Sequence, residues 1–297
     1  TDPVLALADR APAANEQGYA VQLADDAPIR GREGCDRYVA RIVRGVTLEL
    51  PVAEELEPRL AVVQRVLYLL FNEGYLSTAG ERAVREDLCE EAVRLGSLLA
   101  MHPRYGTPAT MALLSLMLFH AARLEARLDD AGRILLLEEQ DRGKWDHELI
   151  AAARRCLDAS ARGERISTYH LEAGIAMQHC SAESFAATDW TKILQLYDAL
   201  LTVQRSPIYL LNRAITLAHL SGPRAGIEAL AELQHDPQLA DYHLLDSTLG
   251  ELHRRLGEFE VARGHFERAR EKARSEPDRE LLPRKLALCE PSRPALQ

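Results

Sequence analysis

Two short stretches of the 297-residue chain place polar side chains directly after apolar ones. In the first, Asn72, Glu73 and Tyr75 close the run VLYLLFNEGY, whose earlier part is almost wholly apolar. A carboxylate at the end of a buried helix must be paired, hydrogen-bonded or beside water. Glu73 is therefore either a structural anchor or the floor of a pocket, and most buried polar groups are satisfied internally.

The second stretch, LEEQDRGKWD, is denser in polar groups than a solvated loop needs, and its tryptophan should pack against something. We take the polar residues of both stretches as candidate binding residues because they could position a partner or a ligand. They are Asn72, Glu73, Tyr75, Gln140, Asp141, Arg142 and Trp145.

Acids and histidines inside apolar helices also have the composition of a pocket with a few convergent polar groups. Glu73 or Asp141 could act as a general base if burial raises its pKa. His120, His170 and His179 are candidates for proton transfer, although a lone histidine on an apolar helix is more often a satisfied core residue. The sequence has no nucleophile elbow, phosphate loop or dinucleotide fingerprint, so we expect no cofactor.

A metal site is not indicated either. Glu172 and His179 are seven residues apart and lie on one helix face, but His170 is about two and a half turns from His179. A di-iron bundle uses two Glu-x-x-His motifs, and this chain has one, from Glu232 to His235. We therefore expect no bound metal.

The totals exclude several function classes. The net charge of −9 argues against a nucleic-acid surface, and the one locally basic segment, Arg30–Arg44, fits a solvated helix face. Five cysteines without CxxC spacing indicate reduced thiols in a cytoplasm. The sequence contains no run of about 18 apolar residues, so we expect no membrane span. The N-terminus lacks a signal pattern, and a first residue other than Met suggests a fragment or a processed product.

The elements that must position these residues are predicted to be helices. The first 30 residues have poor periodicity, and Leu48–Pro51 reads as an extended linker. Pro58 favours a helix that starts near Glu57 and runs into the apolar segment at 66–75, which we expect to be buried. The segment Cys35–Val46 could form a helix, with Tyr38, Val39, Ile42 and Val43 on one side.

The next helix is expected from about Glu81 to Ala100, capped by Ser77 or Thr78, with a salt-bridged exposed face. Pro108 should open the most apolar helix, which contains residues 111–124. Residues 134–137 are a short strand or a buried segment. Asp141 or Asp146 could cap a helix over 147–160, and another helix covers 168–182.

From Trp190 onward the chain repeats itself. The clearest unit of the repeat consists of Gly257, Phe259, Ala262, Phe266 and Ala269. Residues 190–200 match its spacing loosely, as do Ile227 and Ala231. Gly222 precedes Gly257 by one period. A period of about 34 residues built of helix pairs is similar to the tetratricopeptide repeat. Such pairs stack into a curved solenoid, and a last helix near 279–288 should cap it.

Five segments together resemble a known family: VLYLLFNEGY, DLCEEAVRL, HAARLEARLDDAGRILLLEEQDRGKWD, DWTKILQLYDALL and SPIYLLNRAITLA. They are similar to the C-terminal region of extracytoplasmic-function RNA polymerase sigma factors that carry a tetratricopeptide-like extension. The resemblance covers about Val46 to Cys289. It implies that the extension controls the sigma domains. Neither promoter-reading domain is recognisable, although Arg37–Leu50 could be a remnant of the last helix of the second.

We therefore predict an all-α fold in which a helical bundle continues into a tetratricopeptide-like α-solenoid. The expected parts are a leader or degenerate remnant (1–45), a bundle (46–185) and a repeat domain (186–297). The favoured function is a sigma-factor-derived regulatory module that does not itself read promoters. It would hold a protein or peptide in the solenoid groove, with RNA polymerase or a sigma domain as candidates. The alternative is an enzyme or small-molecule binder with an acidic, histidine-containing pocket, for example in a biosynthetic pathway.

Overall fold

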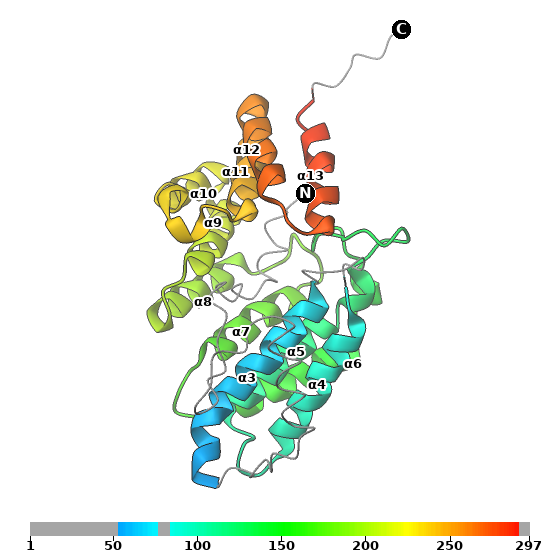
Figure 1. Cartoon of the computed structure of the whole chain (residues 1–297), viewed down its shortest axis with the longest axis vertical. Helices are drawn as coiled ribbons and strands as arrows, with labels where there is room; N and C mark the ends of the chain where they lie inside the picture. The colour runs from blue at the N-terminus through cyan, green and yellow to red at the C-terminus, as the bar shows by residue number, and fades with distance from the viewer. Residues whose placement is uncertain (1–52, 77–83, 291–297) are drawn as a thin grey trace, which may run out of the picture.

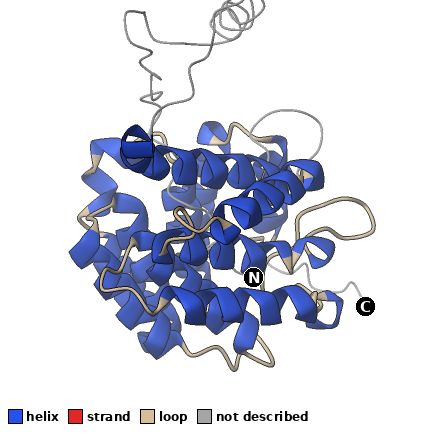
Figure 2. Ribbon diagram, turned by 90° about the horizontal axis from the view of Figure 1, so that it is seen from below, coloured by secondary structure: helices blue, strands red, loops and turns tan. Residues whose placement is uncertain are grey.

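The computed structural model describes residues 53–76 and 84–290 of the chain (Figure 1). Within these ranges the chain forms eleven α-helices, and its only strand-like feature there is an isolated bridge between Leu128 and Ile134. Successive helices pack against one another and are joined by loops (Figure 2). The predicted all-α fold, with a bundle that continues into a solenoid, is confirmed.

The helices of the bundle occupy the lower half of Figure 1. The central one is α5, which packs against all the others and buries most of its residues. Its start follows the sequence prediction: Pro108 is the first helical residue, and the Thr107 hydroxyl accepts a hydrogen bond from the Thr110 backbone N–H at 3.2 Å. The bundle helices are α3 (Ala53–Tyr75), α4 (Glu86–Met101), α5 (Pro108–Ala121), α6 (His147–Ser160) and α7 (Thr168–Ser181).

One helical stretch of the described residues, Pro108–Ala126, is long and apolar enough to pass for a membrane span by length and composition. Its most apolar window is 72% buried inside the protein. A buried core helix meets the same length and composition test, and the central place of α5 in the bundle accounts for its apolar character.

The solenoid helices follow in the upper half of Figure 1. Each of them packs on the one before it, from α7 and α8 through α12 and α13. The 3₁₀ turns Leu233–His235 and Pro237–Leu239 separate α10 from α11. The solenoid helices are α8 (Trp190–Val203), α9 (Pro207–Ser221), α10 (Pro223–Leu230), α11 (His243–Arg255), α12 (Phe259–Lys272) and α13 (Glu276–Ala287).

At the C-terminal end, four of the five residues of the repeat pattern lie in a turn or in the core, and Phe259 is 45% exposed. Gly222 and Gly257 adopt φ angles of 89° and 78° in the turns before α10 and α12, a conformation that glycine reaches without steric cost. Ala262, Phe266 and Ala269 of α12 are fully buried. The small residues let α12 approach α11, and the aromatic ring fills the remaining space.

The middle repeat is irregular at one of the two positions that match the period. Helix α10 has only eight residues and ends at Leu230, so Ala231 lies beyond it and is exposed. Ile227 of α10 is half-buried and packs against the apolar cluster that α9, α10 and α11 share. Bundle and solenoid meet in a shared apolar cluster, so the predicted boundary at residue 185 stays a prediction. That cluster comprises Leu171, Ile175, Ile193, Tyr197, Leu200 and Tyr209.

Two predicted helix starts are wrong. Helix α3 begins at Ala53 rather than near Glu57, so Pro58 lies in its second turn and not in the first turn, where proline is tolerated best. Helix α4 begins at Glu86 rather than near Glu81. The predictions made for residues 1–52 and for the Ser77 or Thr78 cap fall outside the described residues.

Other local predictions are resolved by the structure. Asp146 caps α6, because its side chain accepts hydrogen bonds from two backbone N–H groups at 2.9 Å, whereas Asp141 caps only a 3₁₀ turn. Residues 134–137 are a buried loop segment, with Leu136 and Leu137 almost inaccessible. The exposed pair of Glu91 and Arg94, 2.7 Å apart, confirms the salt-bridged face of α4.

Candidate functional site

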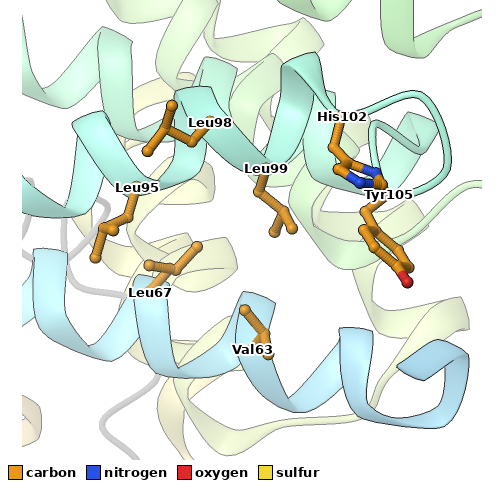
Figure 3. Close-up of a pocket in the computed structure, with 7 residues that line it drawn as sticks. All are labelled: Val63, Leu67, Leu95, Leu98, Leu99, His102 and Tyr105. Carbon is orange, nitrogen blue, oxygen red and sulfur yellow. The ribbon is translucent and has the colours of Figure 1, made fainter. Parts of the chain in front are cut away.

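The outer side of the bundle carries an apolar groove between α3 and α4 (Figure 3). It is an open groove with a volume of about 350 Å³, lined by the side chains of two helices and of the loop that follows α4. The stacked rings of His102 and Tyr105, with centroids 4.4 Å apart, lie at one end. The lining residues are Val63, Leu67, Leu95, Leu98, Leu99, His102 and Tyr105.

Large apolar side chains continue beyond the groove onto the exposed surface. Val62 and Val66 of α3 are 58% and 55% exposed, and Leu98 and Met101 of α4 are 52% and 71% exposed. The apolar run predicts that this part of α3 is buried, and that prediction is wrong for Val66. The run is apolar on more sides than the bundle covers, so one side remains in contact with water.

Helical spacing and one glycine build this groove. Val63 and Leu67 are four residues apart, as are Leu95 and Leu99, so each pair lies on one helix face. The two helices run antiparallel and meet closely at Gly74. Its carbonyl accepts a hydrogen bond from the Arg85 N–H at 2.7 Å, and a Cβ there would lie 2.8 Å from backbone atoms of α4 and of the residue before it.

The first candidate cluster lies where α3 ends. Tyr75 is buried, with the Arg127 guanidinium 3.6 Å from its ring centroid and the His120 ring 5.1 Å away. Asn72 and Glu73 are only half-buried beside it. The structure therefore brings together Tyr75 and His120, two predicted residues, around an arginine that the sequence analysis did not single out.

The second candidate cluster surrounds Trp145, which is buried. The guanidinium carbons of Arg123 and Arg142 lie 5.4 and 4.3 Å from its ring centroid. The side-chain amide oxygen of Gln140 accepts a 3.3 Å hydrogen bond from the Arg123 guanidinium. Asp141 lies apart from them: it is exposed, and its carboxylate accepts from the Gly143 N–H at 2.9 Å.

The two clusters lie on either side of one pair of buried arginines. Arg123 and Arg127 are four residues apart just after α5, and both are almost inaccessible to water. Arg127 contacts the first cluster through Tyr75, and Arg123 contacts the second through Gln140 and Trp145. Two arginines at helical spacing after the most apolar helix were the sequence signal that could have revealed this arrangement.

The three histidines occupy three different environments. His120 packs against Tyr75, and His170 accepts a 3.1 Å hydrogen bond from the Ser167 N–H at the start of α7. Burial lowers the pKa of His170. His179, at the other end of α7, packs edge-on against Trp190. The described residues contain no group of three or more potential metal ligands.

Glu172 of α7, which helical spacing places on one face with His179, has a carboxylate that is buried away from water. It accepts hydrogen bonds from the hydroxyls of Tyr68 in α3 and Tyr209 in α9, each at 2.5 Å. Burial raises the pKa of Glu172, and the two tyrosine hydrogen bonds oppose that rise. Burial and the nearby carboxylate raise the pKa values of both tyrosines, and the pKa of Tyr169 rises to about 12. This contact ties bundle to solenoid.

A second buried carboxylate lies inside the solenoid. Asp246 of α11 contacts three basic side chains of α12: Lys272 at 2.7 Å, His265 at 3.0 Å and Arg268 at 3.1 Å. Although burial works in the opposite direction, these hydrogen bonds and charges hold the pKa of Asp246 well below its usual range. The cluster fixes α12 against α11.

Comparison with known proteins gives two matches. Residues 59–161, which span the groove and both candidate clusters, match a family of unknown function, DUF6596. The chain is also 38% identical over 235 residues to the uncharacterized protein R00370 of Rhizobium meliloti (strain 1021). That alignment covers 78% of this chain and 55% of the relative, so the chain spans about half the length of this relative. No solved structure matches.

Proposed function

We propose that this chain is a regulatory protein-interaction module derived from a sigma factor, and that it does not itself read promoters. The observation that supports this function best is the open apolar groove between α3 and α4. Its exposed rim includes Val66, Leu98 and Met101. Contiguous exposed apolar surface of this kind marks interaction sites in soluble proteins.

The shape of the groove suits a helix from a partner protein. An amphipathic helix binds by laying its apolar face into a hydrophobic groove, with side chains at i, i+3, i+4 and i+7 as anchors. Two antiparallel helices with apolar residues four apart, such as Leu95 and Leu99, offer a complementary surface. By resemblance, the candidate partners are a sigma domain and RNA polymerase. The solenoid groove remains a second proposed binding surface.

Charge supports a protein partner over a nucleic acid. The chain has a net charge of −9, and a DNA-binding surface needs a clustered basic field. Acidic residues of α4, among them Glu86, Asp87 and Glu90, are exposed on the same hairpin that carries the groove. A basic amphipathic helix would therefore meet both apolar and charge complementarity there.

The alternative, an enzyme or small-molecule binder, requires that the candidate acids and histidines share a pocket. Asp141 caps an exposed turn, and His170 and His179 lie at opposite ends of α7, about 13 Å apart along its axis. The roles of the candidate acids and histidines stay a prediction.

The test is direct binding of the purified chain to the promoter-reading domains of a sigma factor of the resembled family and to RNA polymerase, by biolayer interferometry. We expect Leu98→Asp to weaken binding at least tenfold. The matched control is Leu220→Asp, because Leu220 is also partly exposed (40%) but lies on α9. Loss of binding in the control alone would move the site to the solenoid. Absence of binding by the wild-type chain to either partner would refute the proposed function.

A further inference from the structure

Two buried donor groups beside the Trp145 ring have no hydrogen-bond acceptor among the described residues. They are Nε1 of the Trp145 indole and Nη2 of the Arg142 guanidinium, and both nitrogens are inaccessible to solvent. Buried donors in proteins are nearly always hydrogen-bonded, and a bound ion is one physical reason for an exception. We propose that Arg142 and Trp145 form a binding site for an oxyanion, either a phosphate or sulfate group or a carboxylate.

The charges around the ring favour an anion. The Arg142 guanidinium carbon lies 4.3 Å from the Trp145 ring centroid, and that of Arg123 lies 5.4 Å from it. Burial and the charge of Arg123 lower the pKa of Arg142, and only Cys180 acts in the opposite direction. A buried charge is costly without a counter-charge. An anion beside Arg142 would therefore offset both the burial of its charge and the repulsion from Arg123.

The acids of the same loop are engaged elsewhere. Asp141 and Asp146 accept hydrogen bonds from backbone N–H groups of the turns that they cap, and Glu139 accepts one from a backbone N–H at 2.8 Å. Neither these three carboxylates nor that of Glu138 contributes to the pKa of Arg142. The loop is acidic in sequence, yet its acids do not neutralise this guanidinium.

A water molecule would fit these donors less well than an oxyanion. A water that accepts from both nitrogens still has two protons, which need acceptors of their own. The acceptors of the cluster are already in use. Gln140 Oε1 accepts from Arg123 at 3.3 Å, and the carbonyls of His179 and Ala182 accept from Nη1 of Arg142 at 2.7 and 2.9 Å. An oxyanion only accepts, and its hydrogen bond to a guanidinium is charge-assisted.

One oxyanion is large enough to reach both nitrogens. Two hydrogen bonds of about 2.9 Å, joined by two oxygens of one oxyanion, bridge nitrogens up to about 8 Å apart. The guanidinium carbon is 4.3 Å from the ring centroid, and each nitrogen lies only a bond or two further out. The 3₁₀ turn Arg142–Lys144 lies at the surface, with Gly143 and Lys144 exposed, so a shift of this short turn would admit the ligand.

The position of the site connects a small ligand to the junction of bundle and solenoid. Arg142 donates to the carbonyls of His179 and Ala182 at the end of α7. The His179 ring packs edge-on against Trp190, the first residue of α8. A ligand that holds Arg142 in place would therefore stabilise the step from α7 to α8. The site is separate from the groove and takes no protein partner, so it goes beyond the proposed function.

The experiment measures the binding of inorganic phosphate, sulfate and acetate to the full chain by isothermal titration calorimetry and by thermal unfolding, with ionic strength held constant by chloride. We expect saturable binding and a rise in Tm of about 3 °C at a ligand concentration ten times Kd. Binding of phosphate and sulfate alone would assign the site to a tetrahedral oxyanion. Binding of acetate alone would assign it to the carboxylate of an organic ligand.

Two variants remove one donor group each. Trp145→Phe keeps an aromatic ring and removes the Nε1 donor, and Arg142→Gln removes the guanidinium. Each should weaken anion binding at least tenfold. In the ligand-free chain, Trp145→Phe should leave Tm unchanged or raise it, because it removes a buried donor that lacks an acceptor. The matched control is Arg155→Gln, which should bind like the wild-type chain because Arg155 is exposed on α6.

Absence of saturable binding of all three anions would overturn the inference, as would equal weakening by Trp145→Phe and Arg155→Gln. Phosphate and sulfate also stabilise proteins in general, because they are excluded from protein surfaces. A rise in Tm that never saturates and is the same in every variant would be that general effect, and it too would overturn the inference. Each of these results leaves binding of sigma domains to the groove untouched, so the proposed function is decided separately.

Discussion

The two faces of α3 differ in the contacts that their side chains make. The inner face buries Leu67 and Phe71. It also carries Gln64, which donates to the Thr110 hydroxyl at 2.8 Å, and Tyr68, which donates to Glu172. The outer face carries Val62 and Val66, both more than half exposed. Polar groups with partners therefore lie on the side of the core, while two large apolar groups face water.

The difference separates two tasks of one helix. Buried hydrogen bonds depend on distance and angle, so Gln64 and Tyr68 fix where α3 lies relative to α5 and α7. Apolar contacts are not directional, so the outer face can accept different helices of similar shape. A rigidly positioned helix with an adaptable outer face is what a docking surface requires.

The largest effect should come from removing the centre of the inner face. Glu172→Ala leaves the buried hydroxyls of Tyr68 and Tyr209 without their acceptor, and we expect it to lower the free energy of unfolding by about 4 kcal/mol. Urea denaturation measures this. Glu172→Gln keeps an acceptor and should cost clearly less. A loss below about 1 kcal/mol in the alanine variant would mean that this contact does not hold the helices together.

The junction of α3 with α4 is the next most sensitive point. Gly74→Ala places a Cβ 2.8 Å from the Arg85 carbonyl oxygen and the Cys89 nitrogen, both backbone atoms that cannot move alone. We expect a loss of about 3 kcal/mol in stability, because the hairpin must open. The matched control is Gly264→Ala in α12, where the nearest atom is the end of the Arg268 side chain at 3.6 Å. It should be neutral or stabilising, and equal losses in both variants would contradict the close-approach argument.

The pH dependence distinguishes the buried carboxylate at the inner face from the one in the solenoid. The pKa of Glu172 is raised in the folded state. Its contribution to stability is therefore complete below the unfolded pKa of about 4.3 and is lost as pH rises through the folded pKa. The pKa of Asp246 is lowered. Its contribution is present above the unfolded pKa of about 3.9 and is lost as pH falls toward the folded pKa.

Unfolding free energies measured from pH 3 to pH 8 test this contrast. Asp246→Asn should remove part of the acid-side decline, on the order of 2 kcal/mol. Glu172→Gln should lose least relative to the wild-type chain at the alkaline end, where the wild-type carboxylate is disfavoured by burial. The opposite order, with Glu172→Gln changing the acid limb, would show that Glu172 is held as a stabilised anion like Asp246.

The sequence predicted the helices well because their signals are local. Pro108 at the start of α5, Asp146 before α6 and the glycines before α10 and α12 act through their own backbone conformation or through the adjacent N–H groups. The apolar period then shows which helices must pack. These features determine the all-α fold and its order without any knowledge of distant contacts.

The candidate site depended on contacts that the sequence does not contain. Glu172 pairs with Tyr68 and Tyr209, which lie 104 and 37 residues away. Tyr75 is held by Arg127 across the end of α5. The exposure of Val66 was missed for a related reason, because an apolar run gives the width of the apolar surface but not how much of it neighbouring helices cover.

The smallest expected effect tests the outer face and the groove beside it. Leu98 is 52% exposed within the described fold, so we expect Leu98→Ser to lower the free energy of unfolding by no more than about 0.5 kcal/mol. The matched control is Leu220→Ser, because Leu220 is 40% exposed and lies on the solenoid. Urea denaturation of both variants measures the two losses.

Equally small losses in both variants would separate the two faces of α3 completely. The apolar side chains of the outer face and of the groove would then contribute little to folding, and they would serve a partner from another molecule. A loss of more than about 1 kcal/mol from Leu98→Ser alone would mean that the groove side also supports the fold, and the contrast between fixed inner contacts and an adaptable outer face would then fail.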